Sequence, residues 1–290
     1  MSEILSVSHL SHTYSVGTPF EKQAVKDVSF SLEKGEFVAL IGHTGSGKST
    51  LVQMLNGLIR PTSGTVTLDG KDIHAKGSDL RSVRFRVGLC FQYPEYQLFE
   101  ETVYADIAFG PKNKGLSGDA LDNAVKDAAA FAGLDEKNLS VSPFELSGGQ
   151  KRRAAIAGVI AMEPEVLILD EPTAGLDPAG RDSVLQGVDR YRREKNATVL
   201  LVTHDMEDAA QYADRILVMN HGEAELFGTG KEVFSRAERL REIGLALPQP
   251  TELTLLLRRR GYALPNDVFT ADKAVDALLP FLQRGGDGNA

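Results

Sequence analysis

The residues best suited to chemistry lie in a glycine-rich segment at residues 42–49. The segment follows the apolar run 37–41 and precedes the helix-favouring run 51–55. A strand, a glycine-rich loop and a helix in this order form the context of a phosphate-binding loop. Backbone N–H groups of such a loop, and the positive end of the helix that follows, surround the β- and γ-phosphates of a nucleotide. Lys48 would add a point charge and the Ser49 hydroxyl a ligand for Mg²⁺. The plain alternative is a glycine-rich turn that happens to carry a lysine.

Two carboxylates end a second apolar run, residues 166–169. A strand that finishes in Asp170 and Glu171 is the Walker B arrangement. In it, Asp170 would help to hold Mg²⁺, and Glu171 would position and deprotonate an attacking water. General-base catalysis of this kind contributes about 10²–10⁴-fold to a rate. The plain alternative is an acidic turn exposed at the end of a strand.

A third motif, Leu-Ser-Gly-Gly-Gln at residues 146–150, precedes the carboxylates along the chain. Ser147 and the two glycines would begin a helix whose N–H groups face an anion. This pentapeptide is the ABC signature, and with it the chain resembles the nucleotide-binding subunit of an ABC transporter. A surface Ser-Gly-Gly turn is the alternative without function.

The resemblance assigns roles to four further residues. Gln92, after the strand 87–91, matches the Q-loop glutamine, and His204, after the strand 198–202, matches the switch histidine that contacts the γ-phosphate. Asp177 ends a segment similar to the D-loop, and Tyr14 matches the aromatic residue that stacks on adenine. Each has a plain reading as a satisfied polar or packing residue, and that reading is strongest for Tyr14.

The resemblance therefore implies ATP and Mg²⁺ as ligands. The expected catalytic residues are Glu171, His204, Lys48 and Gln92, and the expected metal ligands are Ser49, Gln92 and Asp170. The expected nucleotide-binding residues are Tyr14, Gly42, His43, Thr44, Gly45, Ser46, Gly47, Lys48, Ser49, Thr50, Ser147, Gly148, Gly149, Gln150 and Asp177.

In that family two domains enclose two ATP molecules head to tail. Ser147 and Gly149 would therefore complete the site of a partner chain, and loss of the γ-phosphate would let the pair open. No catalytic group departs from the family pattern, which implies a competent ATPase rather than a regulatory module without turnover.

The segment after Gln92 narrows the resemblance. Residues 91–103 closely resemble the corresponding region of energy-coupling factor transporters, and the runs 42–45, 142–145, 204–208 and 244–248 resemble the second of their two paired ATPases. This implies a homologous ATPase partner in a heterodimer, a transmembrane T subunit docking near Gln92–Thr102, and a substrate-binding S subunit. The expected place is the cytoplasmic face of the cell membrane, and the expected cargo is a vitamin or another micronutrient. The S subunit would choose the cargo, so this chain does not name it.

Two rival functions stay open at this point. The chain could serve an ordinary ABC importer, or a cobalt or nickel transporter with two identical ATPases. It could also be a soluble ABC protein that acts on nucleic acid or ribosomes, although it has neither a second cassette nor a long coiled-coil insertion.

The docking segment also has a reading that is independent of the family. Its apolar residues are Tyr93, Tyr96, Leu98 and Phe99, and carboxylates stand among them at Glu95, Glu100 and Glu101. An apolar patch ringed by carboxylates suits a basic amphipathic helix. The alternative is a buried loop with solvated acids.

Bulk composition limits the remaining classes. The net charge of −8 over 290 residues argues against a direct nucleic-acid binder. The single cysteine, Cys90, cannot pair within the chain, which is simplest in a reducing compartment. No run approaches the roughly 18–20 apolar residues that span a bilayer, and we expect no secretory signal at the start of the chain.

The order of the expected elements predicts an α/β protein of the P-loop ABC ATPase fold. Strands at 4–10, 26–32 and 65–68 predict an antiparallel β subdomain, and the strands at 87–91, 166–169, 198–202 and 216–219 predict a mostly parallel, RecA-like core. We expect an ATP-binding cassette at 1–234, with a helical subdomain at about 93–163 and helices at 119–133 and 151–162. We expect a helical extension at 235–290 with helices at 235–243, 251–260 and 271–284 and a disordered tail from 285. The role of residues 251–290 stays open.

Overall fold

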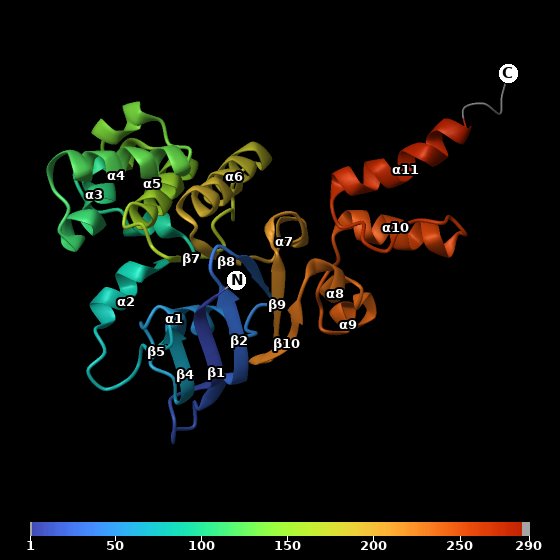
Figure 1. Ribbon diagram of the computed structural model, residues 1–290, viewed down its shortest axis with the longest axis horizontal. Coiled ribbons are helices and arrows are strands. Elements are labelled where there is room, and N and C mark those ends of the chain that lie inside the picture. The colour runs from blue at the N-terminus through green and yellow to red at the C-terminus, as the bar shows by residue number, and fades with distance from the viewer. Residues whose placement is uncertain (1, 286–290) are drawn as a thin grey trace.

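The computed structural model describes residues 2–285, in which a six-stranded sheet forms the centre of the molecule (Figure 1). The strand order is β10-β9-β3-β8-β7-β6, parallel except for β10, which pairs with β9 in the antiparallel sense. The strands are β3 (Phe37–Ile41), β6 (Val87–Cys90), β7 (Val166–Asp170), β8 (Thr198–Val202), β9 (Arg215–Asn220) and β10 (Glu223–Gly228).

Every residue of β3, β7 and β8 is buried, as near-continuous apolar runs in a parallel sheet require. Alternate residues serve different cores: Phe37 joins the core beneath the helices, whereas Val38 and Leu40 join the core shared with the smaller sheet. The prediction of a mostly parallel core is confirmed.

A four-stranded antiparallel sheet of order β2-β1-β4-β5 packs against the larger one. Its strands are β1 (Glu3–Tyr14), β2 (Lys22–Glu33), β4 (Ser63–Leu68) and β5 (Lys71–Asp72). A turn at Asp69-Gly70 joins β4 to β5. β1 and β2 extend further than expected, so only residues 15–21 between them are irregular.

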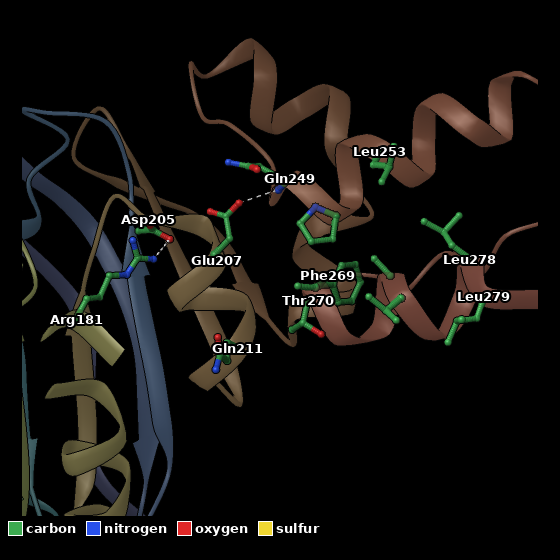
Figure 2. A pocket seen from close by; sticks show the side chains of 14 residues that line it. Arg181, Asp205, Glu207, Gln211, Gln249, Leu253, Phe269, Thr270, Leu278 and Leu279 are labelled. Atoms are coloured by element: carbon green, nitrogen blue, oxygen red, sulfur yellow. Dashed lines mark hydrogen bonds and ion pairs between the residues drawn. The ribbon is translucent and has the colours of Figure 1, made fainter. Parts of the chain in front are cut away.

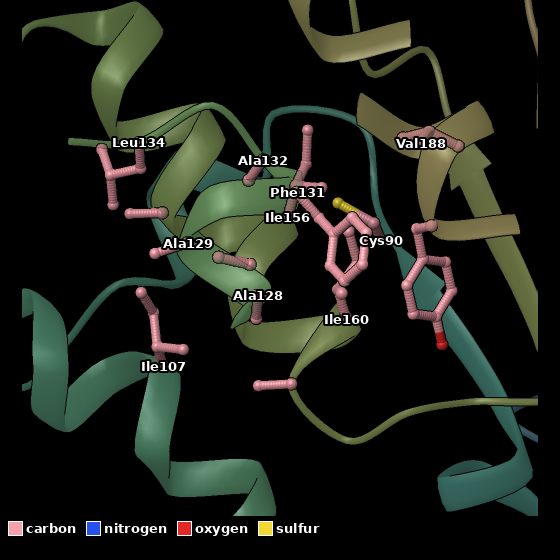
Figure 3. Close-up of a cluster of buried hydrophobic side chains, with 14 of the residues drawn as sticks. Cys90, Ile107, Ala128, Ala129, Phe131, Ala132, Leu134, Ile156, Ile160 and Val188 are labelled. Carbon is pink, nitrogen blue, oxygen red and sulfur yellow. The ribbon is translucent and has the colours of Figure 1, made fainter. Parts of the chain in front are cut away.

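Helices α3, α4 and α5 form a lobe at one end of the sheet, in the region predicted as the helical subdomain (Figure 1). Figure 3 shows the core of this lobe, where Ile107, Phe131 and Ile156 pack near Cys90 of β6. Burial raises the pKa of the Cys90 thiol to about 12, so this cysteine is structural. Before residue 230 the helices are α1 (Lys48–Leu55), α2 (Leu80–Arg86), α3 (Val103–Lys114), α4 (Gly118–Phe131), α5 (Gly148–Ile160), α6 (Pro178–Lys195) and α7 (Met206–Tyr212).

The C-terminal part is helical, as predicted; its first expected helix, 235–243, corresponds to the slightly shorter α9, and a further helix, α8, precedes it. The structure has α8 (Gly230–Phe234) and α9 (Ala237–Glu242), then α10 (Gln249–Arg259) and α11 (Ala271–Gly285). A capping box between Thr229 and Glu232 starts α8 within the segment that we assigned to the cassette. Thr270 caps α11 as predicted, through a 3.4 Å hydrogen bond from the Lys273 amide. Of the tail expected from residue 285, Gly285 ends α11, and residues 286–290 lie outside the described part of the chain.

The C-terminal helices are not separate from the cassette. Leu240, Leu245 and Phe269 share a core with Ile41 of β3 and Val218 of β9. The division at residue 234 stays a prediction about domains. Within residues 2–285 no helix is both long and apolar enough to cross a bilayer.

Candidate active site

The glycine-rich loop lies between β3 and α1 at the carboxyl edge of the large sheet, as predicted. Two of its glycines are required by close packing. A Cβ atom on Gly42 would lie 2.3 Å from the Met219 carbonyl oxygen, and one on Gly47 would lie 2.4 Å from the Ala24 carbonyl oxygen. Gly47 also has φ +103°, a region that L side chains rarely adopt. The loop thus keeps its backbone N–H groups free of side-chain cover.

Lys48 reaches back across this loop. Its ammonium group donates hydrogen bonds to the carbonyl oxygens of Gly42 at 2.6 Å and His43 at 3.1 Å. Burial lowers the pKa of Lys48, and the charges of Glu171 and Asp170 oppose that shift. The cation is therefore held over the loop, within the field of both carboxylates.

Asp170 ends β7 beside this cation and is almost completely buried. Burial raises its pKa, and a hydrogen bond with the Ser49 hydroxyl opposes the rise. A carboxylate and a hydroxyl are hard oxygen donors of the kind that Mg²⁺ takes together with substrate phosphates. Among residues 2–285 no group of three or more His, Cys, Asp or Glu residues could hold a metal by itself. The donor set therefore fits Mg²⁺ bound with a nucleotide.

Glu171 and His204 meet at the same edge of the sheet. The His204 Nδ1 atom lies 2.9 Å from Glu171 Oε2, and the Glu171 side chain is mostly buried whereas His204 is mostly exposed. Glu171 has φ +51°, a left-handed conformation for which a non-glycine residue pays about 1–3 kcal/mol. Its amide is held by the Val202 carbonyl oxygen at 2.9 Å. The fold therefore fixes this carboxylate in a strained backbone position beside an exposed imidazole.

Two further residues of the predicted site, Gln92 and Tyr14, are exposed. Gln92 follows Phe91, the first residue after β6, and β6 is two strands from β8 in the sheet. Tyr14 ends β1, and its hydroxyl lies 3.2 Å from Thr50 Oγ1 at the start of α1. Tyr14 and Lys22 line a hollow of about 200 Å³ with the glycine-rich loop. The ring is thus next to the loop, where a base attached to bound phosphates would need a stacking partner.

The signature segment begins a helix, as predicted, but in the helical lobe. Ser147 is the N-cap of α5 and forms a capping box with Gln150: the Ser147 amide donates to Gln150 Oε1 at 2.9 Å. Ser147 and Gly148 are exposed. Within residues 2–285 no hydrogen bond joins residues 147–150 to the glycine-rich loop. Within one chain, these two segments, both predicted to bind anions, therefore lie on separate surfaces.

Asp177 also begins a helix. Its carboxylate accepts a 2.8 Å hydrogen bond from the Gly180 amide and so caps α6. Four residues further along, Arg181 pairs with Asp205 at 2.6 Å and with Asp208 at 2.8 Å, which ties α6 to the segment after His204 (Figure 2). Sequence reasoning missed Arg181, because nothing local indicates partners 24 and 27 residues away.

Glu95 was predicted to be one of the carboxylates around an apolar docking patch, but in the structure it is paired within the chain. Its carboxylate accepts hydrogen bonds from Arg152 Nη2 at 2.8 Å and Nε at 3.2 Å, and the Arg152 side chain is only 5% exposed. Burying an arginine requires a paired carboxylate. Glu95 therefore locks the segment after Gln92 onto α5, the helix that begins with the signature, and is not free for a partner. Arg152 was also missed, because its partner lies 57 residues away.

Other residues of the predicted docking segment border a groove of about 620 Å³ between α2, α3 and α5. Phe99 and Phe109 line it and contact each other edge to face at 5.0 Å. Phe99 is 61% and Tyr96 86% exposed, so the alternative of a buried apolar loop does not hold for them. Arg81 and Arg84 stand on the opposite wall and donate to carbonyl oxygens of Asn113 and Gly57.

Comparison with known proteins agrees with this geometry. A family model described as "ABC transporter" matches residues 25–174. The chain is 51% identical to the energy-coupling factor transporter ATP-binding protein EcfA2 of Caldanaerobacter subterraneus, over 96% of this chain and 98% of that protein. It is 52% identical to EcfA2 of Clostridium perfringens over 96% of this chain and 98% of that protein.

Two solved structures are also similar. cbiO1 of Clostridium perfringens, described as part of the ABC transporter complex cbiONQ, superposes with a TM-score of 0.74 at 38% identity and covers 89% of this chain and 100% of its own. A dimeric ATP-binding cassette, MJ0796, with bound ADP and phosphate superposes with a TM-score of 0.71 at 29% identity, over 78% of this chain and 98% of its own.

Proposed function

Because the chain belongs to the ABC transporter family, and within it to the energy-coupling factor ATP-binding proteins, we propose that it powers micronutrient uptake as one half of an ATPase pair. The partner half would be a homologous ATPase, and the pair would drive a T subunit and a cargo-binding S subunit at the cytoplasmic face of the membrane. The observation that carries the proposal is the meeting of the phosphate loop, the Asp170–Glu171 pair and His204 at one sheet edge.

We assign each site residue a role in binding or hydrolysis. Lys48 and the loop N–H groups bind the phosphates, and Tyr14 offers its ring to adenine. Ser49, Asp170 and Gln92 would hold Mg²⁺, which would supply charge neutralisation at the phosphates. Glu171 orients water and takes its proton, and His204, hydrogen-bonded to that carboxylate at 2.9 Å, faces the γ-phosphate.

The separation of the signature from the loop supports a composite site. Ser147 and Gly148, at the start of α5, are exposed, so a second cassette could receive them. MJ0796, a 29% identical cassette, forms a dimer with bound ADP and phosphate. In our proposal the signature of this chain therefore completes the nucleotide site of its partner, and Asp177 holds the D-loop through its cap on α6.

The C-terminal helices offer a second surface to the partner. Leu253, Phe269 and Leu279 border a groove of about 760 Å³ between α7, α10 and α11 (Figure 2). Val275 and Leu279 of α11 are 56% and 43% exposed. We propose that these residues contribute apolar contacts to the ATPase pair.

A second candidate, an importer with two identical ATPases, differs from the first in what this chain does alone. Purified alone, this chain would then form a closed dimer with Mg-ATP when hydrolysis is blocked. In the first candidate, closure would need the second ATPase. Light scattering of the chain with and without its homologue separates the two.

The docking of the T subunit is tested by charge reversal beside the groove. The double variant Glu100→Lys, Glu101→Lys should reduce co-purification of the T subunit about tenfold or more, because like charges would face a basic partner helix. Nucleotide affinity of the isolated chain should stay unchanged. Glu95 is left intact, since its loss would strand the buried Arg152.

Asp127→Lys, an exposed charge reversal on α4 of the same lobe, is the matched control and should keep the T subunit bound. Equal recovery of the T subunit with the Glu100/Glu101 variant and with this control would refute the proposed docking site.

A further inference from the structure

A chain of polar contacts connects α9, in the C-terminal part, with the phosphate loop. Arg239 Nε donates to Glu225 Oε1 at 2.6 Å, and Asn220 Nδ2 donates to Glu225 Oε2 at 3.2 Å. Asn220 Oδ1 then lies 3.2 Å from His43 Nε2. The four residues come from α9, β10, the end of β9 and the loop itself, so the fold alone brings them together.

The donor and acceptor groups determine how each hydrogen bond in this series is oriented. A carboxylate only accepts hydrogen bonds, so Glu225 turns the NH₂ group of Asn220 toward itself and the amide oxygen toward His43. His43 Nε2 donates to Asn220 Oδ1 when it carries the ring proton. The other ring nitrogen, Nδ1, lies 2.9 Å from the Thr44 carbonyl oxygen, which also only accepts, so a neutral imidazole donates to one of the two oxygens. Arg239 keeps the acceptor in place, because its hydrogen bond lowers the pKa of Glu225. Loss of Arg239 therefore removes the group that holds Glu225, the residue that fixes the Asn220 amide.

Backbone groups connect the phosphate loop with the turn after Asn220 and with Lys48. The Gly222 amide, in the turn after Asn220, donates to the Ser46 carbonyl oxygen at 3.0 Å. The carbonyl oxygen of His43 accepts a 3.1 Å hydrogen bond from Lys48, the cation intended for the phosphates. A shift of His43 therefore moves a group that holds Lys48.

We propose that His43 is a positioning residue of the phosphate loop and that Arg239, through Glu225 and Asn220, sets its position. ATP affinity would thus depend on α9, a helix of the C-terminal part that contributes no residue to the nucleotide site. This inference rests on the proposed ATP site and adds to it a contact by which the C-terminal helices control nucleotide binding.

The test measures the affinity of the full-length chain for a fluorescent ATP analogue with Mg²⁺, and KM and kcat for ATP of the assembled ATPase pair. Arg239→Ala should weaken binding about 3- to 10-fold, as residues along a coupling network do, with kcat near the wild-type value. His43→Ala should weaken binding at least as much. The double variant should bind no more weakly than His43→Ala alone, because both changes interrupt the same series of contacts.

Arg241→Ala is the matched control. Arg241 lies on the same helix and pairs with Glu252 of α10, so its loss removes an exposed ion pair without touching the chain to His43. It should bind ATP with wild-type affinity. His43→Gln, which keeps a donor for Asn220, should recover part of the affinity lost in His43→Ala.

Wild-type affinity of Arg239→Ala, or effects that multiply in the double variant, would overturn the inference while leaving the ATP site intact. A wild-type chain that binds no ATP under these conditions would instead overturn the proposed function, and the inference with it.

Discussion

Replacing Glu171 by glutamine is expected to abolish ATP hydrolysis while ATP binding persists. The amide keeps the shape of the side chain but cannot take a proton from water, which should lower kcat about 10²–10⁴-fold. The replacement keeps the backbone position of Glu171, because the hydrogen bond from its amide to the Val202 carbonyl oxygen does not involve the side chain. Phosphate release by the assembled ATPase pair, with a parallel measurement of nucleotide affinity, checks the result.

The same variant should accumulate as a closed dimer with its partner ATPase in Mg-ATP, because the γ-phosphate that bridges the two chains is not removed. Glu194→Gln, an exposed carboxylate on α6 outside the site, is the control and should hydrolyse ATP normally. Near-wild-type turnover of Glu171→Gln would show that another group is the base.

Replacing Lys48 by alanine should weaken Mg-ATP binding about 10- to 100-fold, since a hydrogen bond between charged groups contributes about 1.5–3 kcal/mol. The change removes the cation that is held at 2.6 Å from the Gly42 carbonyl oxygen. It also leaves Asp170 and Glu171 without the positive charge between them. Isothermal titration of the full-length chain with Mg-ATP measures the effect.

Thermal unfolding gives an independent check on Lys48, because a ligand that binds only the folded state raises Tm. Mg-ATP should raise the Tm of the wild-type chain and of Lys71→Ala, an exposed lysine on β5, but raise that of Lys48→Ala less. An equal rise in all three proteins would mean that Lys48 does not bind the phosphates.

The parts of the site that the sequence predicted are local. The glycine-rich loop, the Asp170–Glu171 pair and the cap at Ser147 each depend on residues a few positions apart, and the structure has each at the expected end of a strand or helix. That Glu171 and His204 approach each other follows from parallel strands, whose carboxyl ends share one edge. Their roles in catalysis stay predictions.

The parts that escaped prediction depend on distant partners. Glu95 looked like a free carboxylate until the fold brought Arg152 to it, and His43 looked like one of several loop residues until the fold brought Asn220 to it. No periodicity or motif connects residues 57 or 177 positions apart.

Two predicted helix boundaries were wrong because local signals were misinterpreted. We expected a helix from residue 251, but α10 begins at Gln249, because proline is tolerated in the first turn of a helix. The start of α8 was readable from the Thr-x-x-Glu pattern at residues 229–232, and it was missed because we assigned that stretch to the end of the cassette.

The central claim is that this chain works as one ATPase of an energy-coupling factor transporter. The most direct test is affinity purification of the tagged full-length chain from its native membrane, followed by mass spectrometry of the proteins that accompany it. The account predicts a second, homologous ATPase, one T-type membrane protein and small, variable membrane proteins that bind the cargo. Recovery of a dedicated permease pair with a binding protein, or of ribosomal proteins alone, would contradict it.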